Sequence, residues 1–198
     1  MIYRQYAKKV HKIYSQLDRQ IESFKRATGL ECLDPCGQCC LNPHVEATIL
    51  EMLPLSLHLL GTGQAEFWLD RIYERESNTK CIFFQNSPDT PHHGQCLFYN
   101  KRALICRLFN FSAIKNKKDR WLLVSCKRLK DSSSEKVIKA QEMIDNGLDV
   151  PKMNIYAMRI FNINVHLGSK YYPINMAFKI ALETVLMRSK FFFRKMAS

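Results

Sequence analysis

The stretch from Cys32 to Cys40, CLDPCGQCC, holds four cysteines in nine residues, which is too many thiols for packing alone to explain. Cys36 and Cys39 have the C-x2-C spacing that directs two thiolates at one metal ion. Gly37 lets the backbone between them turn tightly, because it has no Cβ. Cys39 and Cys40 are adjacent, and neighbouring side chains in a non-helical segment point apart, so one tetrahedral ion rarely takes both. The stretch therefore predicts two metal sites or a bridged cluster.

All the cysteines of the chain lie between Cys32 and Cys126, and the roughly seventy residues that follow contain none. They therefore belong to one constellation. The candidate metal ligands are Cys32, Cys36, Cys39, Cys40, Cys81, Cys96, Cys106 and Cys126. In a reducing compartment, thiols at such spacings are typical metal ligands, whereas in a secreted protein they would form disulfides.

The N-terminal segment bears on the compartment. The first dozen residues are strongly basic and are not followed by an apolar core, which argues against a secretory signal. The most apolar stretch, near the C-terminus, is interrupted by Lys179, Glu183 and Arg188, so no window is suited to span a membrane. We therefore expect a cytoplasmic protein with reduced thiols and no transmembrane segment.

The formal net charge is +12 when every thiol is counted as neutral. Eight thiolates that hold two divalent ions would lower this charge by four units, so part of the basic surplus serves the thiols. The basic residues closest to the cysteines in sequence are Arg102, Arg107, Lys127 and Arg128. If they face the thiols, their charges lower the thiol pKa values; otherwise they form an ordinary solvated surface.

Apolar residues at intervals of three and four predict an amphipathic helix from Ile2 to Phe24, which Gly29 ends. A second apolar stretch, from Val45 to Leu60, predicts a helix that Pro54 either starts or kinks. Further helices are expected over residues 64–76, over residues 135–145 and from Pro173 to Phe193.

The segment between the later cysteines changes character. Short strands are expected at Cys81–Phe84, Cys96–Tyr99 and Trp121–Val124. The predicted fold is mainly α with a small irregular β element, in which a cysteine-rich, metal-stapled core is flanked by N- and C-terminal helices. We expect one domain over residues 1–198, with a metal-binding core over 32–126 and a helical C-terminal extension over 132–198. Because the core shows little periodic apolar surface, the metal is expected to hold it folded.

Three cysteine elements resemble a known family. They are Cys32-x3-Cys36-x2-Cys39-Cys40, Cys81-Ile-Phe-Phe and Cys96-x5-Arg102-x3-Cys106-Arg107. This order resembles the YkgJ-like cysteine-cluster family, CxxCxxCC, which is described as a zinc- or iron-chelating domain. Ile82 and Ala103 stand where the family has proline, and both changes affect backbone stiffness rather than ligation. The resemblance covers Cys32 to Cys126 and implies a metal without fixing a reaction.

The cysteines and the resemblance together predict a metal-binding protein that holds zinc or an iron–sulfur cluster, because all-thiolate sites suit both. His92 and His93 are alternative ligands, since mixed Cys/His sites occur for zinc.

Two other functions stay open. Some family members are described as flagellin lysine methylases and others as iron–sulfur oxidoreductases, so an iron–sulfur-dependent enzyme is the first alternative. The sequence has no G-x-G-x-x-G or H-E-x-x-H motif that would supply the rest of such an active site. A zinc-dependent nucleic-acid-binding protein is the second alternative. Against this alternative, the sequence lacks finger-type spacing of cysteines and histidines, and its basic residues are spread over every segment.

Overall fold

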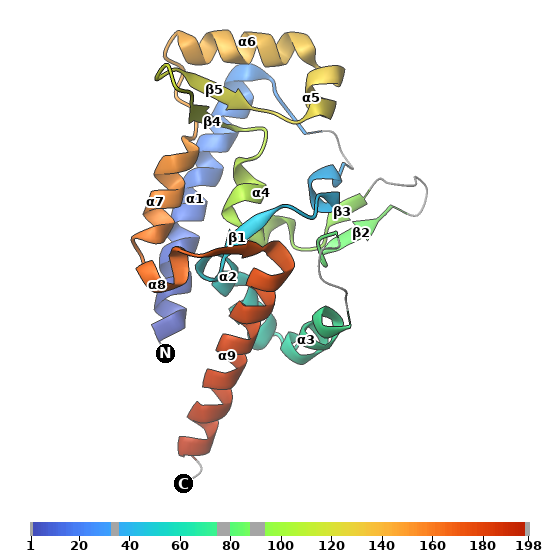
Figure 1. Ribbon diagram of the computed structural model, residues 1–198, viewed down its shortest axis with the longest axis vertical. Helices are drawn as coiled ribbons and strands as arrows, with labels where there is room; N and C mark the ends of the chain where they lie inside the picture. The colour runs from blue at the N-terminus through green and yellow to red at the C-terminus, as the bar shows by residue number, and fades with distance from the viewer. Residues whose placement is uncertain (1, 33–35, 75–79, 88–93, 197–198) are drawn as a thin grey trace.

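Figure 1 shows the computed structural model, which describes residues 2–32, 36–74, 80–87 and 94–196, with the side chains of the last helix described up to residue 189. Three long helices form the body of the molecule: α1 (Ile2–Thr28), α2 (Ile49–Gly61) and α9 (Ile174–Met196). Helix α2 packs against both α1 and α9. Within the described residues, no helix is long and apolar enough to cross a membrane.

Shorter elements surround these three helices. The helices are α3 (Ala65–Tyr73), α4 (Leu104–Leu108), α5 (Lys127–Ser132), α6 (Ser134–Asp145), α7 (Met153–Phe161) and α8 (Val165–Gly168), with 3₁₀ turns η1 (Gln38–Leu41) and η2 (Tyr99–Lys101). The strands pair antiparallel as β1 (Glu46–Thr48) with β6 (Tyr171–Pro173), β2 (Phe84–Asn86) with β3 (Gly94–Cys96), and β4 (Ser112–Lys115) with β5 (Trp121–Val124). The prediction of a mainly α fold with a small β element is confirmed.

The strongly periodic segments fold as expected. Helix α1 buries the apolar face that its sequence predicts, and it ends at Gly29, whose positive φ of 67° closes the last turn. Helix α2 begins with a capping box in which Thr48 and Glu51 satisfy each other's backbone N–H groups. Pro54 lies inside α2, so the alternative that it starts the helix is wrong.

The strand predictions near the cysteines are wrong in position. The residues expected as the first strand, Cys81–Phe84, instead form a turn, and strand β2 begins only at Phe84. Ile82 and Phe83 are buried in the hydrophobic core, which they reach from the turn. The second expected strand is also displaced, since β3 ends at Cys96. Apolar composition indicated burial here, and burial does not require a strand. The strand from Trp121 to Val124 is confirmed.

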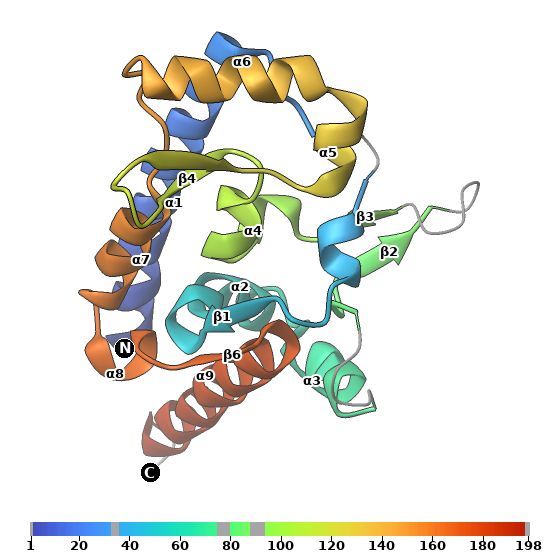
Figure 2. The same ribbon diagram turned by 45° about the horizontal axis from the view of Figure 1, so that its top comes forward.

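One hydrophobic cluster draws side chains from both the cysteine-rich segment and the flanking helices. Phe83 packs edge-on against Phe178 of α9, with ring centroids 4.7 Å apart, and also contacts Trp68 of α3. Figure 2 shows α2 and α4 lying among the outer helices rather than at one end of the molecule. The cysteine-rich segment therefore contributes part of the packed core through α2, α3 and Phe83.

Candidate metal centre

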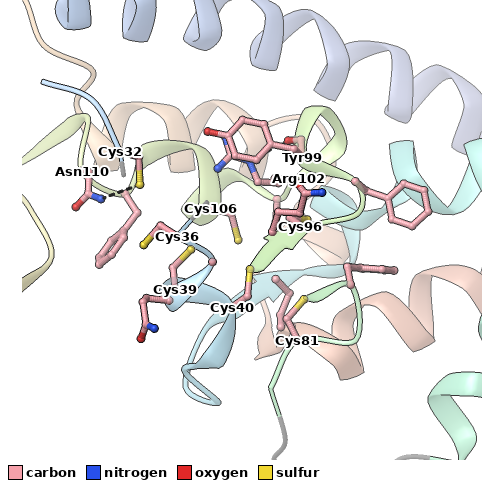
Figure 3. A pocket seen from close by; sticks show the side chains of 18 of the residues that line it. Cys32, Cys36, Cys39, Cys40, Cys81, Cys96, Tyr99, Arg102, Cys106 and Asn110 are labelled. Carbon is pink, nitrogen blue, oxygen red and sulfur yellow. Dashed lines mark hydrogen bonds between the residues drawn. The ribbon is translucent and has the colours of Figure 1, made fainter. Parts of the chain in front are cut away.

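The predicted ligands all line one pocket of about 510 Å³ (Figure 3). The cysteines reach it from separate elements: Cys32 and Cys36 from the loop after α1, Cys39 and Cys40 from η1, Cys81 from the turn before β2, Cys96 from β3, Cys106 from α4, and Cys126 from the N-cap of α5. None of the predicted ligands lies elsewhere. We call this cavity the thiol pocket.

Two glycines let the first cysteine segment approach the β2–β3 hairpin closely. Gly37 has a φ of 55°, and a Cβ there would overlap the Phe84 ring and the Gly94 carbonyl. A Cβ on Gly94 would overlap the carbonyl oxygen of Gln85. The prediction that Gly37 permits a tight turn is confirmed. Gly94 was not identified from the sequence, and its only signal is its place two residues before Cys96.

The geometry of the adjacent cysteines differs from the expectation. Cys39 and Cys40 lie in the 3₁₀ turn η1, not in extended backbone, and their thiols are in hydrogen-bonding contact. The hydrogen bond from Cys40 lowers the pKa of Cys39 to about 6, although burial opposes this. Hydrogen-bonding contacts with Cys39, Cys81 and Cys96, in that order, raise the pKa of Cys40. The two thiols therefore lie side by side and do not point apart.

A second set of thiols gathers on the Cys32 side of the pocket. Burial, followed by the neighbouring thiols of Cys36, Cys39 and Cys126, raises the pKa of Cys32 to about 11. These causes place Cys32 in the electrostatic neighbourhood of three other cysteines. Figure 3 shows Cys32, Cys36 and Cys39 on one side, and Cys40, Cys81 and Cys96 on the other.

Asn110 joins two thiol-bearing segments, and the sequence reasoning missed it. Its Nδ2 donates to Cys32 Sγ at 3.9 Å, and its Oδ1 accepts from the Cys126 backbone N–H at 2.6 Å. The residue is buried and has a φ of 73°, a left-handed conformation that asparagine tolerates better than most residues. Its amide thus positions Cys32 relative to Cys126.

The Cys106 thiol comes from α4 and is half-buried. Burial raises the pKa of its thiol, the thiols of Cys81 and Cys39 add to this, and the charge of Arg102 opposes them. Arg102 stacks on the ring of Tyr99, with its guanidinium carbon 3.5 Å from the ring centroid, and its Nε donates to the Tyr99 carbonyl at 2.9 Å. This supports the expectation that Arg102 offsets thiolate charge.

Arg107 has a different role from the one its position suggested. Its guanidinium is paired with the carboxylate of Asp18 on α1, with Nη1–oxygen distances of 2.6 and 2.7 Å. It also donates to the carbonyls of Asn100 and Arg102 at 2.6 and 2.9 Å, and it lies over the ring of Tyr14. Arg107 therefore does not face the thiols. It anchors to α1 the turn that carries Arg102.

The remaining basic residues divide in the same way. Arg128 Nη1 donates to Cys36 Sγ at 3.6 Å, whereas Lys127 is exposed and does not line the thiol pocket. Lys25 and Lys101 line the pocket, although the first lies seven residues before Cys32 and was not selected from the sequence. The positive charge near the thiols comes from several elements.

The thiols share the pocket without forming a ready coordination sphere. Among the residues that the structure describes, no three Cys, His, Asp or Glu side chains are arranged as a set that could hold a metal ion. His92 and His93 lie outside the described residues.

The fold and the pocket define a mainly helical protein with a cysteine-lined cavity. Residues 31–127 match the model of the CxxCxxCC family, described as "Putative zinc- or iron-chelating domain". This segment, which contains all the cysteines, is therefore similar to that family. The resemblance seen in the sequence is confirmed, and α1 and the helices after α5 lie outside the matched segment. Searches of curated proteins and of solved structures gave no match.

Proposed function

We propose that the thiol pocket is a metal centre in which the eight cysteines hold zinc or an iron–sulfur cluster. The observation that carries this proposal is that all eight cysteines, spread over residues 32–126, line a single pocket. Thiolates are soft ligands that suit both kinds of centre. When bound, the metal would cross-link segments that are far apart in the sequence.

We infer two groups of four thiols, because most of the thiols that shift one another's pKa values fall within one group or the other. One group consists of Cys40, Cys81, Cys96 and Cys106, and the other of Cys32, Cys36, Cys39 and Cys126. Two relations join the groups: the hydrogen-bonding contact between Cys39 and Cys40, and the effect of the Cys39 thiol on the pKa of Cys106. In this arrangement the adjacent cysteines serve different metal positions, and the centre is continuous.

Positive charge around the pocket supports binding by thiolates rather than by neutral thiols. Lys25, Lys101 and Arg102 line the pocket, and Arg128 donates to Cys36. Nearby cations stabilise thiolates, and deprotonated sulfur is the form that binds metal. Burial raises the pKa of Cys32 and of Cys106, so metal binding at these positions must displace the proton.

The test is metal analysis of protein purified without oxygen, together with its visible absorption spectrum. We expect either a brown protein with iron and sulfide or a colourless one with about two zinc ions per chain. Cys40→Ser and Cys126→Ser should each lower the metal content. Ser125→Ala is the matched control, because the Ser125 hydroxyl is buried, has no hydrogen-bond partner among the described residues and directly precedes Cys126 in the chain.

One result of the metal analysis would contradict the two-group arrangement. Recovery of a single mononuclear zinc per chain, with metal content unchanged in Cys40→Ser, would show that not all eight cysteines serve as ligands. A metal-free protein after anaerobic purification and reconstitution would reject the metal centre itself.

A further inference from the structure

A second pocket, of about 400 Å³, adjoins the thiol pocket. It is lined from β1, β6, α4 and α7, and its lining shares Cys39, Cys106 and Phe109 with the thiol pocket. Ile105, Phe109 and Met153 are partly exposed apolar parts of its wall, and Leu104 and Leu108 lie buried behind it. We call it the apolar pocket. Its volume lies within the range of small-molecule sites, which are mostly apolar with a few polar groups.

Apart from the buried Glu51, the charged, amide, imidazole and hydroxyl side chains of the apolar pocket are exposed. Asn42 and His44 are exposed, as is Tyr171, which has half of its surface accessible. The thiols of Cys39 and Cys106 are in contrast half-buried, and Leu108 is fully buried. A molecule in this pocket would have an apolar environment for its body and hydrogen-bonding partners for its outer end.

The charge of the lining argues against an anionic ligand. Within the described part of the chain, no lysine or arginine lines the apolar pocket, although the net charge of the protein is +12. The carboxylates in the lining are those of Glu46 and Glu51. Burial raises the pKa of Tyr171, and Glu51 and Glu46 add to this shift. An anion would therefore meet negative charge and find no cation to pair with.

The same carboxylates offer little to a cationic ligand. Glu51 is buried, and its Oε1 already accepts from the Thr48 N–H and hydroxyl, both at 3.0 Å. Its Oε2 accepts from the Leu104 N–H at 2.9 Å. Glu46 is exposed, where water and salt screen its charge. A buried cation would consequently lose its hydration without gaining a close counterion.

We propose that the apolar pocket binds an uncharged, mainly apolar small molecule of one or two rings, whose polar atom lies near Asn42, His44 and Tyr171. Its apolar body packs against Ile105, Phe109 and Met153, beside Cys39 and Cys106. This goes beyond the proposed metal binding, because the site places a small molecule next to thiols from each of the two groups. Binding in the pocket does not itself require the metal.

The test uses the full-length protein with its metal as isolated, and 2-naphthol as the probe. Calorimetric titration should show saturable binding, with 2-naphthalenesulfonate and naphthylmethylammonium each binding at least about tenfold more weakly. Ala157→Phe fills the pocket from α7, and should weaken 2-naphthol binding by about tenfold or more. Met158→Phe is the matched control, since Met158 is the next residue, is exposed and does not line the pocket.

Three results would overturn the proposal: no binding of 2-naphthol at millimolar concentration, tighter binding of the sulfonate, or unchanged affinity in Ala157→Phe. The comparison of the three probes uses the wild-type protein, so it decides the question even if a variant does not fold. Metal content is measured on the same samples. Loss of probe binding with full metal content separates failure of this proposal from failure of the metal centre.

Discussion

Replacing Asp18 by asparagine is expected to destabilise the protein and weaken its hold on the metal, because Asp18 neutralises a buried arginine next to the thiol pocket. Arg107 is only 5% exposed, and Asp18 is the acidic side chain paired with it among the described residues. The variant keeps the side-chain shape of Asp18 but removes the charge. The hydrogen bonds from Arg107 to the carbonyls of Asn100 and Arg102 are left in place.

The expected loss is about 2 kcal/mol in the free energy of unfolding. Breaking a fully buried ion pair costs about 3–5 kcal/mol, whereas a hydrogen bond to a charged group contributes about 1.5–3 kcal/mol. The lower range applies, because the Asp18 side chain is 51% exposed and the two carbonyls still accept from Arg107. Such a loss is a substantial part of the roughly 5–15 kcal/mol that stabilises a typical domain.

The assay is urea unfolding of the metal-loaded and metal-free proteins, followed by circular dichroism, with a parallel measurement of metal release to a chelator. Asp119→Asn is the matched control, because it removes a carboxylate that is 83% exposed and whose partner, Lys115, is 40% exposed and does not line the thiol pocket. Asp119→Asn should change stability by less than about 0.5 kcal/mol. If Asp18→Asn changes stability as little as the control and releases metal at the wild-type rate, Arg107 does not position the turn that carries Arg102.

Two further predictions concern the thiol pocket. Gly94→Ala should lower metal content, because a Cβ there overlaps the Gln85 carbonyl and would push apart the two strands of the hairpin that carries Cys96. Gly61→Ala, whose Cβ meets no atom of the described residues within 4 Å, should retain the metal. Equal metal content in the two glycine variants would refute the close approach. Verified metal removal should increase amide hydrogen exchange at Cys81, Cys96 and Cys106, while α2 stays protected by its packing against α1 and α9. Unchanged protection of the three cysteine amides would show that the metal does not hold this region folded.

Much of the helical structure could be predicted from the sequence, because an amphipathic face depends on residues three and four apart. Helix α1 follows from such a pattern, and Gly29 marks its end. The pairing of β1 with β6 could not be predicted in this way. It joins Ala47 to Tyr172, and neither three-residue strand carries a pattern long enough to detect. The short strands near the cysteines were misplaced for the same reason, since Ile82 and Phe83 read as strand residues yet pack from a turn.

The identities of the candidate ligands were available from the sequence alone, since the chemistry of a thiol and the spacing of Cys36 and Cys39 are local properties. The tertiary structure decided which thiols are neighbours. It also decided the role of Arg107, whose partner Asp18 is 89 residues away, and that of Asn110, which connects Cys32 to Cys126. Local sequence determines what a side chain can do, whereas the folding of distant segments against one another determines which side chain it meets.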